Sequence, residues 1–222
     1  MGSTGSLVIR SRRWRRNKHM RPDLLITGFG PFPGVPVNPS ARLVEALARL
    51  PGWLWLGWKV RHAILPVSYG PTEAALAPLL EKRPRAILMF GVAARRKAVT
   101  VEIVARNRTS RTARDASGRL PKLARLDSGP AILKGRAPMP RLRDLLREAG
   151  NPVRLSRNAG PYLCNAAYRF ALRGTKAKVP VVFVHVPRVR NSSDPRGIAF
   201  GPLLAGSAAI ARRLVLASRL AP

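Results

Sequence analysis

The sequence predicts an α/β fold, a three-layer α/β/α sandwich with a mostly parallel twisted sheet. From residue 23 onward, strand-like apolar runs alternate with helix-like segments, which is typical of a parallel sheet covered on both faces. A length of 222 residues, 46% of them hydrophobic, suffices for one domain with a sizeable core. No stretch approaches the roughly 18 unbroken apolar residues of a membrane span. We therefore expect a soluble single domain over residues 21–222, with no membrane partner.

The expected strands are short apolar runs bounded by glycine, proline or other turn residues. They cover Leu24–Thr27, part of Lys59–Val67, Ala86–Phe90, Val99–Arg106, Val153–Ser156 and Val181–Val186. Val99–Arg106 alternates enough to indicate a half-buried strand, whereas Val181–Val186 is continuously apolar and predicts a buried one.

The expected helices show apolar residues at spacings of three and four. They cover Pro39–Leu50, Pro71–Glu81, Leu142–Glu148, Asn165–Leu172 and Leu203–Leu220. Asn38 is placed to cap the first helix, with Pro39 at its first position. Asn107–Met139 carries many turn residues and is expected to be a long loop. Residues 1–20 are Gly/Ser-rich and then basic, so we expect a disordered basic N-terminal tail.

The charge is strongly positive: 41 Lys and Arg against 10 Asp and Glu give a formal net charge of +31. Such a balance favours polyanions, because neutralised phosphates release counterions. The arginines are scattered, however, and only 6% of the residues are aromatic, whereas nucleic-acid binders concentrate charge among aromatics. We therefore expect only non-specific nucleic-acid binding, with compositional arginine bias as the simpler explanation.

Several function classes are excluded by missing motifs. Gly28-Phe-Gly30 opens like a dinucleotide fingerprint, but Pro33 stands at the third glycine position. No phosphate-binding loop, serine-hydrolase elbow or paired-histidine zinc motif is present. Three histidines and one cysteine provide few ligands for a metal ion, so we expect no cofactor and no metal.

Three residues remain as a candidate catalytic group. Cys164 falls where a helix begins, and the helix dipole there favours the thiolate. His185 lies near the carboxyl end of a buried strand, and Glu102 is the one acid inside an apolar strand. Each has a plain alternative: a buried small hydrophobe, a core histidine, and a carboxylate facing solvent. Together they suggest the Cys-His-acid arrangement of a thiol hydrolase, whereas His62 is taken as structural.

The sequence resembles a known family, the pyroglutamyl peptidases I (pyrrolidone-carboxylate peptidases) of peptidase family C15. The matching blocks are Thr27-Gly-Phe-Gly-Pro-Phe with Asn38-Pro-Ser, Thr100-Val-Glu followed by Asn107, Ala159-Gly-Pro-Tyr-Leu-Cys-Asn, and Val184-His-Val-Pro. They occur in the order and spacing of the family and cover nearly the whole chain beyond the tail.

The resemblance implies removal of an N-terminal pyroglutamyl residue from peptides, without a cofactor. It implies Cys164 as nucleophile, His185 as general base and then acid, and Glu102 as the residue that orients the imidazole. It also implies a cytoplasmic homo-oligomer, as a tetramer. Pyroglutamate has no free α-amine, so its pocket needs no carboxylate, and a small apolar slot with a few amide partners suffices.

The resemblance further implies a lactam pocket. Its matching residues are Phe29, Phe32, Asn38, Tyr162 and Leu163. For Asn38 a helix cap is a complete alternative explanation.

The chain also departs from the family pattern. Pro33 replaces a glycine, Ile103 replaces a basic residue, and Arg111 and Thr112 match the pocket side only loosely. Added basic residues, among them Arg157 and Arg188, are expected to shift the preference for the leaving peptide toward acidic residues.

Two other functions stay open. One is a related thiol amidase with a different small acyl group, because fold and catalytic group do not fix the substrate. The other is an inactive protein of this fold that binds polyanions.

Overall fold

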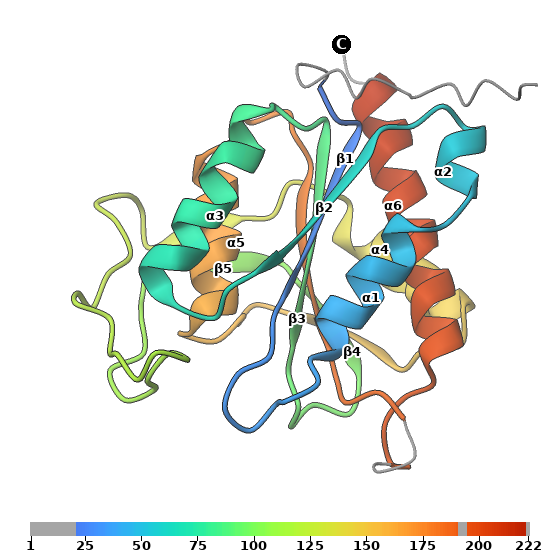
Figure 1. The fold of residues 1–222 in the computed structure, drawn as a ribbon. Coiled ribbons are helices and arrows are strands. Elements are labelled where there is room, and N and C mark those ends of the chain that lie inside the picture. The colour runs from blue at the N-terminus through green and yellow to red at the C-terminus, as the bar shows by residue number, and fades with distance from the viewer. Residues whose placement is uncertain (1–20, 191–194, 221–222) are drawn as a thin grey trace, which may run out of the picture.

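A six-stranded sheet in the order β2-β1-β3-β8-β4-β7 forms the centre of the molecule (Figure 1). The computed structural model describes residues 21–190 and 195–220, so the expected tail 1–20 lies outside the described residues. The strands of this sheet are β1 (Leu24–Phe29), β2 (Val60–Leu65), β3 (Ala86–Val92), β4 (Val99–Glu102), β7 (Val153–Ser156) and β8 (Val181–Val186). Neighbouring strands are parallel except β4 and β8, which run antiparallel. The predicted mostly parallel sheet is confirmed.

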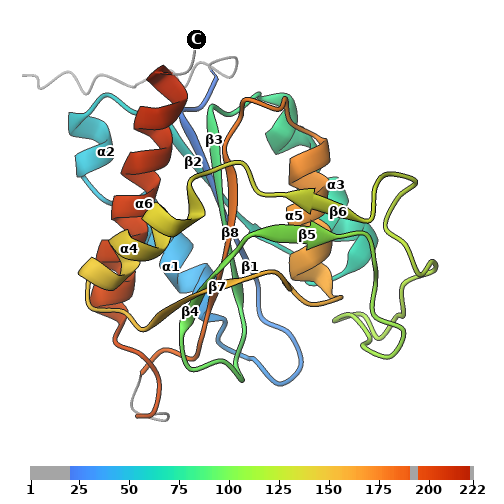
Figure 2. The same ribbon diagram turned by 180° about the vertical axis from the view of Figure 1, so that it is seen from behind.

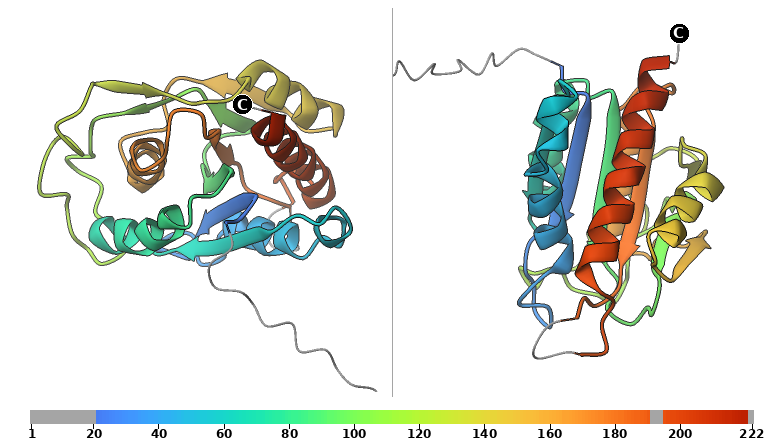
Figure 3. Two further views of the ribbon diagram at one scale, coloured as in Figure 1. Left: turned by 90° about the horizontal axis from the view of Figure 1, so that it is seen from above. Right: turned by 90° about the vertical axis from the view of Figure 1, so that its right-hand side faces the viewer.

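Helices cover both faces of the sheet, which gives the predicted three layers (Figure 3). Their bounds are α1 (Pro39–Ala48), α2 (Gly52–Trp55), α3 (Tyr69–Glu81), α4 (Met139–Glu148), α5 (Leu163–Arg173) and α6 (Phe200–Leu220). On one face α3 and α5 pack, and on the other α1, α4 and α6. The short helix α2 was not predicted, whereas the predicted cap of α1 is confirmed, because Asn38 Oδ1 accepts a hydrogen bond from Ser40 N.

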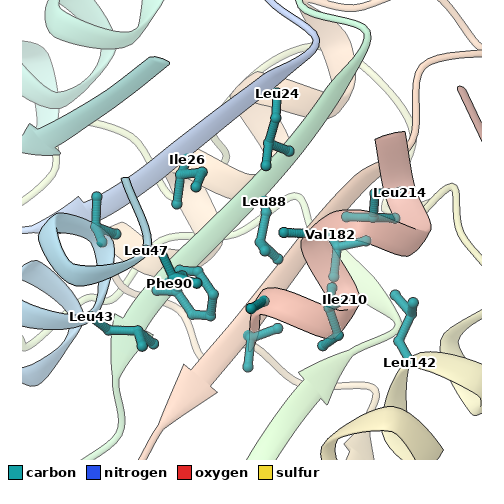
Figure 4. Close-up of a cluster of buried hydrophobic side chains, with 14 of the residues drawn as sticks. Leu24, Ile26, Leu43, Leu47, Leu88, Phe90, Leu142, Val182, Ile210 and Leu214 are labelled. Atoms are coloured by element: carbon teal, nitrogen blue, oxygen red, sulfur yellow. The ribbon is translucent and has the colours of Figure 1, made fainter. Parts of the chain in front are cut away.

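Alternate residues of each central strand enter two separate cores, as a period of two requires. On β8, Val182 and Val184 point toward α1 and α6, while Val181 and Phe183 point toward α5. Figure 4 shows the first of these cores, in which leucine, isoleucine, valine and phenylalanine side chains from strands and helices interdigitate. This alternation decides which strand residues can reach α5.

The prediction of one half-buried strand over Val99–Arg106 is wrong. The chain changes sheets at Ile103, whose N–H bonds Ser156 O and whose carbonyl accepts from Gly135 N. Consequently β4 is fully buried in the main sheet, and β5 (Val104–Arg106) pairs with β6 (Ile132–Lys134) in a second, two-stranded sheet (Figure 2). The expected loop of residues 107–139 therefore contains a strand and the first residue of α4.

Several contacts fix the long segment between β5 and β6 to the domain, among them one set at its base and one at its tip. At its base, Arg169 of α5, only 1% exposed, holds both carboxylate oxygens of Asp127 at 2.7 and 2.8 Å. At its tip, Asp115 accepts from Tyr69 N and Ala116 N bonds Val67 O. The segment is thereby held beside the first turn of α3 and along α5.

By length and composition alone, one helix among the described residues, α6, could cross a membrane. In the fold α6 lies against the sheet, and Leu203, Ile210 and Leu214 are buried in the core shown in Figure 4. It carries Arg212 and Arg213 near its middle. These features are those of a core helix.

Candidate active site

The three candidate catalytic residues lie on the α5 side of the sheet. On β8, His185 points to the same face of the sheet as Phe183, the face covered by α5. On β4, Val101 points toward α1 and α6, so its neighbour Glu102 points to the opposite face. Thr100 pairs with His185 in the antiparallel register, so Glu102 lies two residues further along, within diagonal reach of the imidazole. The single reversal of strand direction in the sheet thus places an acid beside a histidine.

The imidazole and the carboxylate are hydrogen-bonded. The distance between His185 Nδ1 and Glu102 Oε1 is 2.8 Å, and both side chains are buried. Glu102 is 0% exposed, so the alternative of a solvent-facing carboxylate is wrong. A carboxylate on Nδ1 fixes the ring orientation and leaves Nε2 as the nitrogen available for proton transfer.

Cys164, the second residue of α5, lies next to this pair. A Cβ placed on Gly91 would be 2.6 Å from Cys164 Sγ, and Gly91 is the register partner of His185 across β3 and β8. The sulfur therefore occupies the space that the missing side chain of Gly91 leaves. Because Gly91 and His185 are register partners on neighbouring strands, the register places the thiol beside the strand position of His185.

Polar contacts fix the segments on either side of Cys164. Asn165 is fully buried: its Oδ1 accepts from Arg106 N at 2.8 Å and its Nδ2 donates to Arg106 O and Arg108 O. These bonds attach the start of α5 to β5. Before the helix, Gly160 has φ +79°, a left-handed conformation that favours glycine, and Gly160 N bonds Asn158 Oδ1.

Burial raises the pKa of the Cys164 thiol to about 12, with the Glu102 charge adding to it. Burial, the largest effect, also lowers the pKa of His185 against the raising effect of the Glu102 hydrogen bond. The resting site therefore holds a neutral thiol and a neutral imidazole. Against this burial, the Arg96 charge and the backbone N–H of Cys164 at the start of α5 lower the same pKa, so the expected effect of the helix start is present but is smaller than desolvation.

Glu102 stays ionised in spite of its burial. Burial opposes the charge, but the hydrogen bond and charge of His185, with Ser156 and Arg96, lower the pKa of this carboxyl below its ordinary value. Arg96 contributes an ion pair, with its Nη1 at 2.6 Å from Glu102 Oε1. The site thus contains one fixed negative charge that faces the imidazole.

Most of the predicted pocket residues belong to the same apolar cluster as α5. Phe29 and Leu163 are buried in it, and Phe32, Tyr162 and Cys164 pack against it. Tyr162 also donates its hydroxyl to Arg114 O and meets Tyr69 edge to face, 6.2 Å between ring centroids. Cys164 and these four residues therefore belong to one apolar region on the α5 side of the sheet.

The polar atoms of Asn38 are engaged within the β1–α1 loop. Its Oδ1 accepts from Ser40 N and Oγ, and its Nδ2 donates to Gly30 O at 2.9 Å, so the side chain closes the β1–α1 loop. Of the other residues weighed, Arg111 and Thr112 are exposed on the long segment, and His62 is exposed on the edge strand β2.

Sequence reasoning missed Gly91, Asn165 and Arg96 as parts of the site. Asn165 directly follows the nucleophile candidate, and a buried amide there could have been suspected from the helix start. Arg96 is one of 41 basic residues, and no local pattern distinguishes it. Within residues 21–190 and 195–220, no group of His, Cys, Asp or Glu side chains is arranged to hold a metal ion.

Comparison with known proteins agrees with this architecture. The family model Peptidase_C15, described as pyroglutamyl peptidase, matches residues 22–197. The chain is 37% identical over 174 residues to a pyrrolidone-carboxylate peptidase of Deinococcus radiodurans, covering 75% of this chain and 78% of that one. It is 36% identical over 169 residues to the Thermococcus kodakarensis protein of the same name, covering 74% and 80%.

Solved structures agree as well. The crystal structure of the pyrrolidone carboxyl peptidase from Thermus thermophilus superposes with a TM-score of 0.75 at 33% identity, covering 88% of this chain and 99% of that one. The fold and these likenesses define the chain as a peptidase. It belongs to the pyroglutamyl peptidase family, peptidase family C15.

Proposed function

We propose that this protein removes N-terminal pyroglutamyl residues from peptides by thiol catalysis. The observation that carries the proposal is the hydrogen bond between His185 Nδ1 and Glu102 Oε1, 2.8 Å long, beside the chain's one cysteine. A nucleophile, a base and a group that orients the base are the minimum set for acyl transfer of this type. Family membership supports the substrate class.

In this mechanism Cys164 Sγ attacks the pyroglutamyl carbonyl carbon while His185 Nε2 takes the thiol proton. The neutral thiol and neutral imidazole of the resting site favour this concerted transfer over a preformed ion pair. Glu102 stabilises the imidazolium that forms. The C–N bond then breaks, Nε2 returns the proton to the leaving amine, and a thioester remains. Water, deprotonated by His185 Nε2, attacks the thioester carbonyl; the C–S bond breaks, pyroglutamate leaves, and Nε2 returns the proton to Cys164 Sγ.

Negative charge on the carbonyl oxygen would be stabilised by N–H groups at the start of α5. The helix begins at Leu163, and its first amides have no carbonyl partner within the helix. Such N–H groups point along the axis toward developing charge, and their dipoles add to the effect. Cys164 is the second residue of this helix, so its own N–H is one of these donors.

The acyl specificity rests on the apolar wall next to the sulfur. Phe29, Phe32, Tyr162 and Leu163 suit a neutral five-membered lactam better than a charged prolyl or glutamyl end, because an unpaired ammonium there would be desolvated. Asn38 holds the loop that follows Phe29 through its bond to Gly30 O. We also propose, on family resemblance, a cytoplasmic homo-oligomer.

The test is release of a fluorophore from a pyroglutamyl amide, with the matching prolyl amide as a substrate control. Turnover of the pyroglutamyl amide by the wild type and none by Cys164→Ala would support the proposal. Turnover of other acyl amides only would instead favour a related thiol amidase. No turnover of any amide, together with salt-dependent RNA binding, would favour an inactive polyanion-binding protein.

A further inference from the structure

Arg96 joins two parts of the site that are far apart in sequence. Its Nη1 donates to Glu102 Oε1 at 2.6 Å, and its Nη2 donates to Asn158 O at 2.9 Å. Glu102 lies on β4, and Asn158 lies in the segment that leads from β7 to Cys164. One planar guanidinium therefore connects the acid to the nucleophile's approach segment.

The carboxylate needs this contact for its position. Glu102 Oε1 accepts from both His185 and Arg96, while Oε2 is buried without a hydrogen-bond partner among the described residues. Two donors, one of them a guanidinium, hold this oxygen in place more firmly than one donor would. Arg96 is about one-third exposed, whereas Glu102 is fully enclosed, so the guanidinium seals the outer side of the acid.

We propose that Arg96 is a positioning residue of the peptidase site, holding the Glu102 carboxylate against His185 and tying it to the segment that ends at Cys164. The inference rests on the proposed function for its kinetic consequences. The contacts themselves, and their effect on the thiol, do not depend on the substrate.

The charge of Arg96 gives the proposal a second readout. The groups that face Glu102 are His185 from β8, Ser156 from β7, and Cys164 and Tyr168 from α5. Among them, the Arg96 charge lowers the pKa values of both Cys164 and His185. Removing this cation must therefore raise both, which slows thiol alkylation and moves the acid limb of kcat/KM to higher pH.

The experiment compares three variants with the wild type. Arg96→Met removes the charge and both hydrogen bonds, and Arg96→Lys keeps the charge but cannot form the planar double contact. Arg95→Met is the matched control, because it removes the same charge from an exposed neighbouring residue. For each we would measure kcat and KM on a pyroglutamyl amide, the melting temperature, and the rate of Cys164 alkylation by iodoacetamide. With one cysteine in the chain, that rate reports this thiol alone.

We expect Arg96→Met to lower kcat roughly 10- to 100-fold with KM little changed, the size of a lost hydrogen bond to a charged group. Alkylation should slow about threefold or more at a fixed alkaline pH. Arg96→Lys should restore the alkylation rate and the pH profile but only part of kcat, and Arg95→Met should change none of these.

Two results would overturn the inference. One is an Arg96→Met protein that matches Arg95→Met in kcat and in alkylation rate. The other is full recovery of kcat by Arg96→Lys, since charge alone would then suffice. A folded wild type that hydrolyses no pyroglutamyl amide would defeat the proposed function. In that case, slower alkylation in Arg96→Met than in Arg95→Met would still support the role of Arg96, and equal rates would overturn it.

Discussion

Gly91 on β3 and Cys164 on α5 are so close that a Cβ on the glycine would stand 2.6 Å from the sulfur and 2.9 Å from the Phe183 ring. Real Cβ atoms do not approach other heavy atoms this closely, so the glycine is required by packing rather than by backbone conformation. The thiol position and the sheet surface are therefore matched to one another at this point.

Gly91→Ala should consequently impair catalysis more than stability. The new methyl group must displace Cys164 Sγ or the Phe183 ring. Misplacement of a reacting group by about 1 Å lowers a rate about 100-fold. The matched control is Gly70→Ala in α3, where a Cβ would meet nothing within 4 Å. Steady-state kinetics and thermal melts of both variants check the prediction. Equal activity of the two variants would contradict it.

The acid limb of the kcat/KM profile should lie below the ordinary histidine pKa of about 6.5. In the proposed mechanism His185 must be neutral to accept the thiol proton, and burial lowers its pKa. Activity is therefore retained as the pH falls through 6.5 and is lost only at the lower pKa of His185. A pH series with a fluorogenic substrate checks this, and an acid limb at or above pH 6.5 would show that the pKa of His185 is not lowered.

Glu102→Gln should move the acid limb of the kcat/KM profile to still lower pH and reduce kcat roughly 1000-fold. The carboxylate favours the imidazolium, so its loss lowers the pKa of His185, and the amide no longer stabilises the charge that forms during attack. Glu45→Gln, an exposed position on α1, is the control and should behave as wild type. The same pH series measures both effects, and an unchanged kcat in Glu102→Gln would exclude the assigned role.

Asp127→Asn should destabilise the fold by about 3 kcal/mol, because the buried guanidinium of Arg169 would lose its carboxylate. The hydrogen bond from Arg169 is the main cause that lowers the pKa of Asp127 to about 2. Stability from this lowered pKa is present above the unfolded value of about 3.9 and is lost as the pH falls toward 2.

Urea unfolding across that acid range measures this contribution, which Asp127→Asn should lack. Asp144→Asn, which breaks only surface ion pairs of α4, is the control and should change stability by less than about 1 kcal/mol. Equal losses in the two variants would mean that the Asp127–Arg169 contact does not anchor the long segment.

Pyroglutamyl peptides with an acidic second residue should have a KM two- to fivefold lower than those with a lysine there, a difference of about 0.4 to 1 kcal/mol. The approach segment to Cys164 carries the exposed Arg157, and Arg108 contacts Asn158 Oδ1 at 3.4 Å. The preference should shrink with added salt. Arg157→Gln should weaken it, while the remote exposed Arg213→Gln should not; a preference insensitive to salt would argue against an electrostatic origin.

Local signals sufficed to predict much of the fold. The capped start of α1 and the buried runs of β1, β3 and β8 need only neighbouring residues to be recognised, and the structure confirms them. The switch at Ile103 could not be predicted, because it depends on the pairing of β5 with residues almost thirty positions later. Within the site, the residue types of the candidate triad stood out by rarity in the sequence. Arg96 did not stand out, because its contacts with Glu102 and Asn158 form only when the fold brings β4 and the segment before α5 together.

The antiparallel alignment of β4 with β8 makes the orientation of Glu102 depend on the number of residues that precede it in β4. Because side chains alternate, deletion of one residue within residues 99–101 would turn Glu102 toward α1 and α6 and place Ile103 at the position from which Glu102 now reaches His185. The charge would then lie in a hydrocarbon core with no counterion. Length variation among related chains is therefore expected to spare this strand. An intact strand length is thus as much a requirement for this chemistry as the identity of its reactive residues.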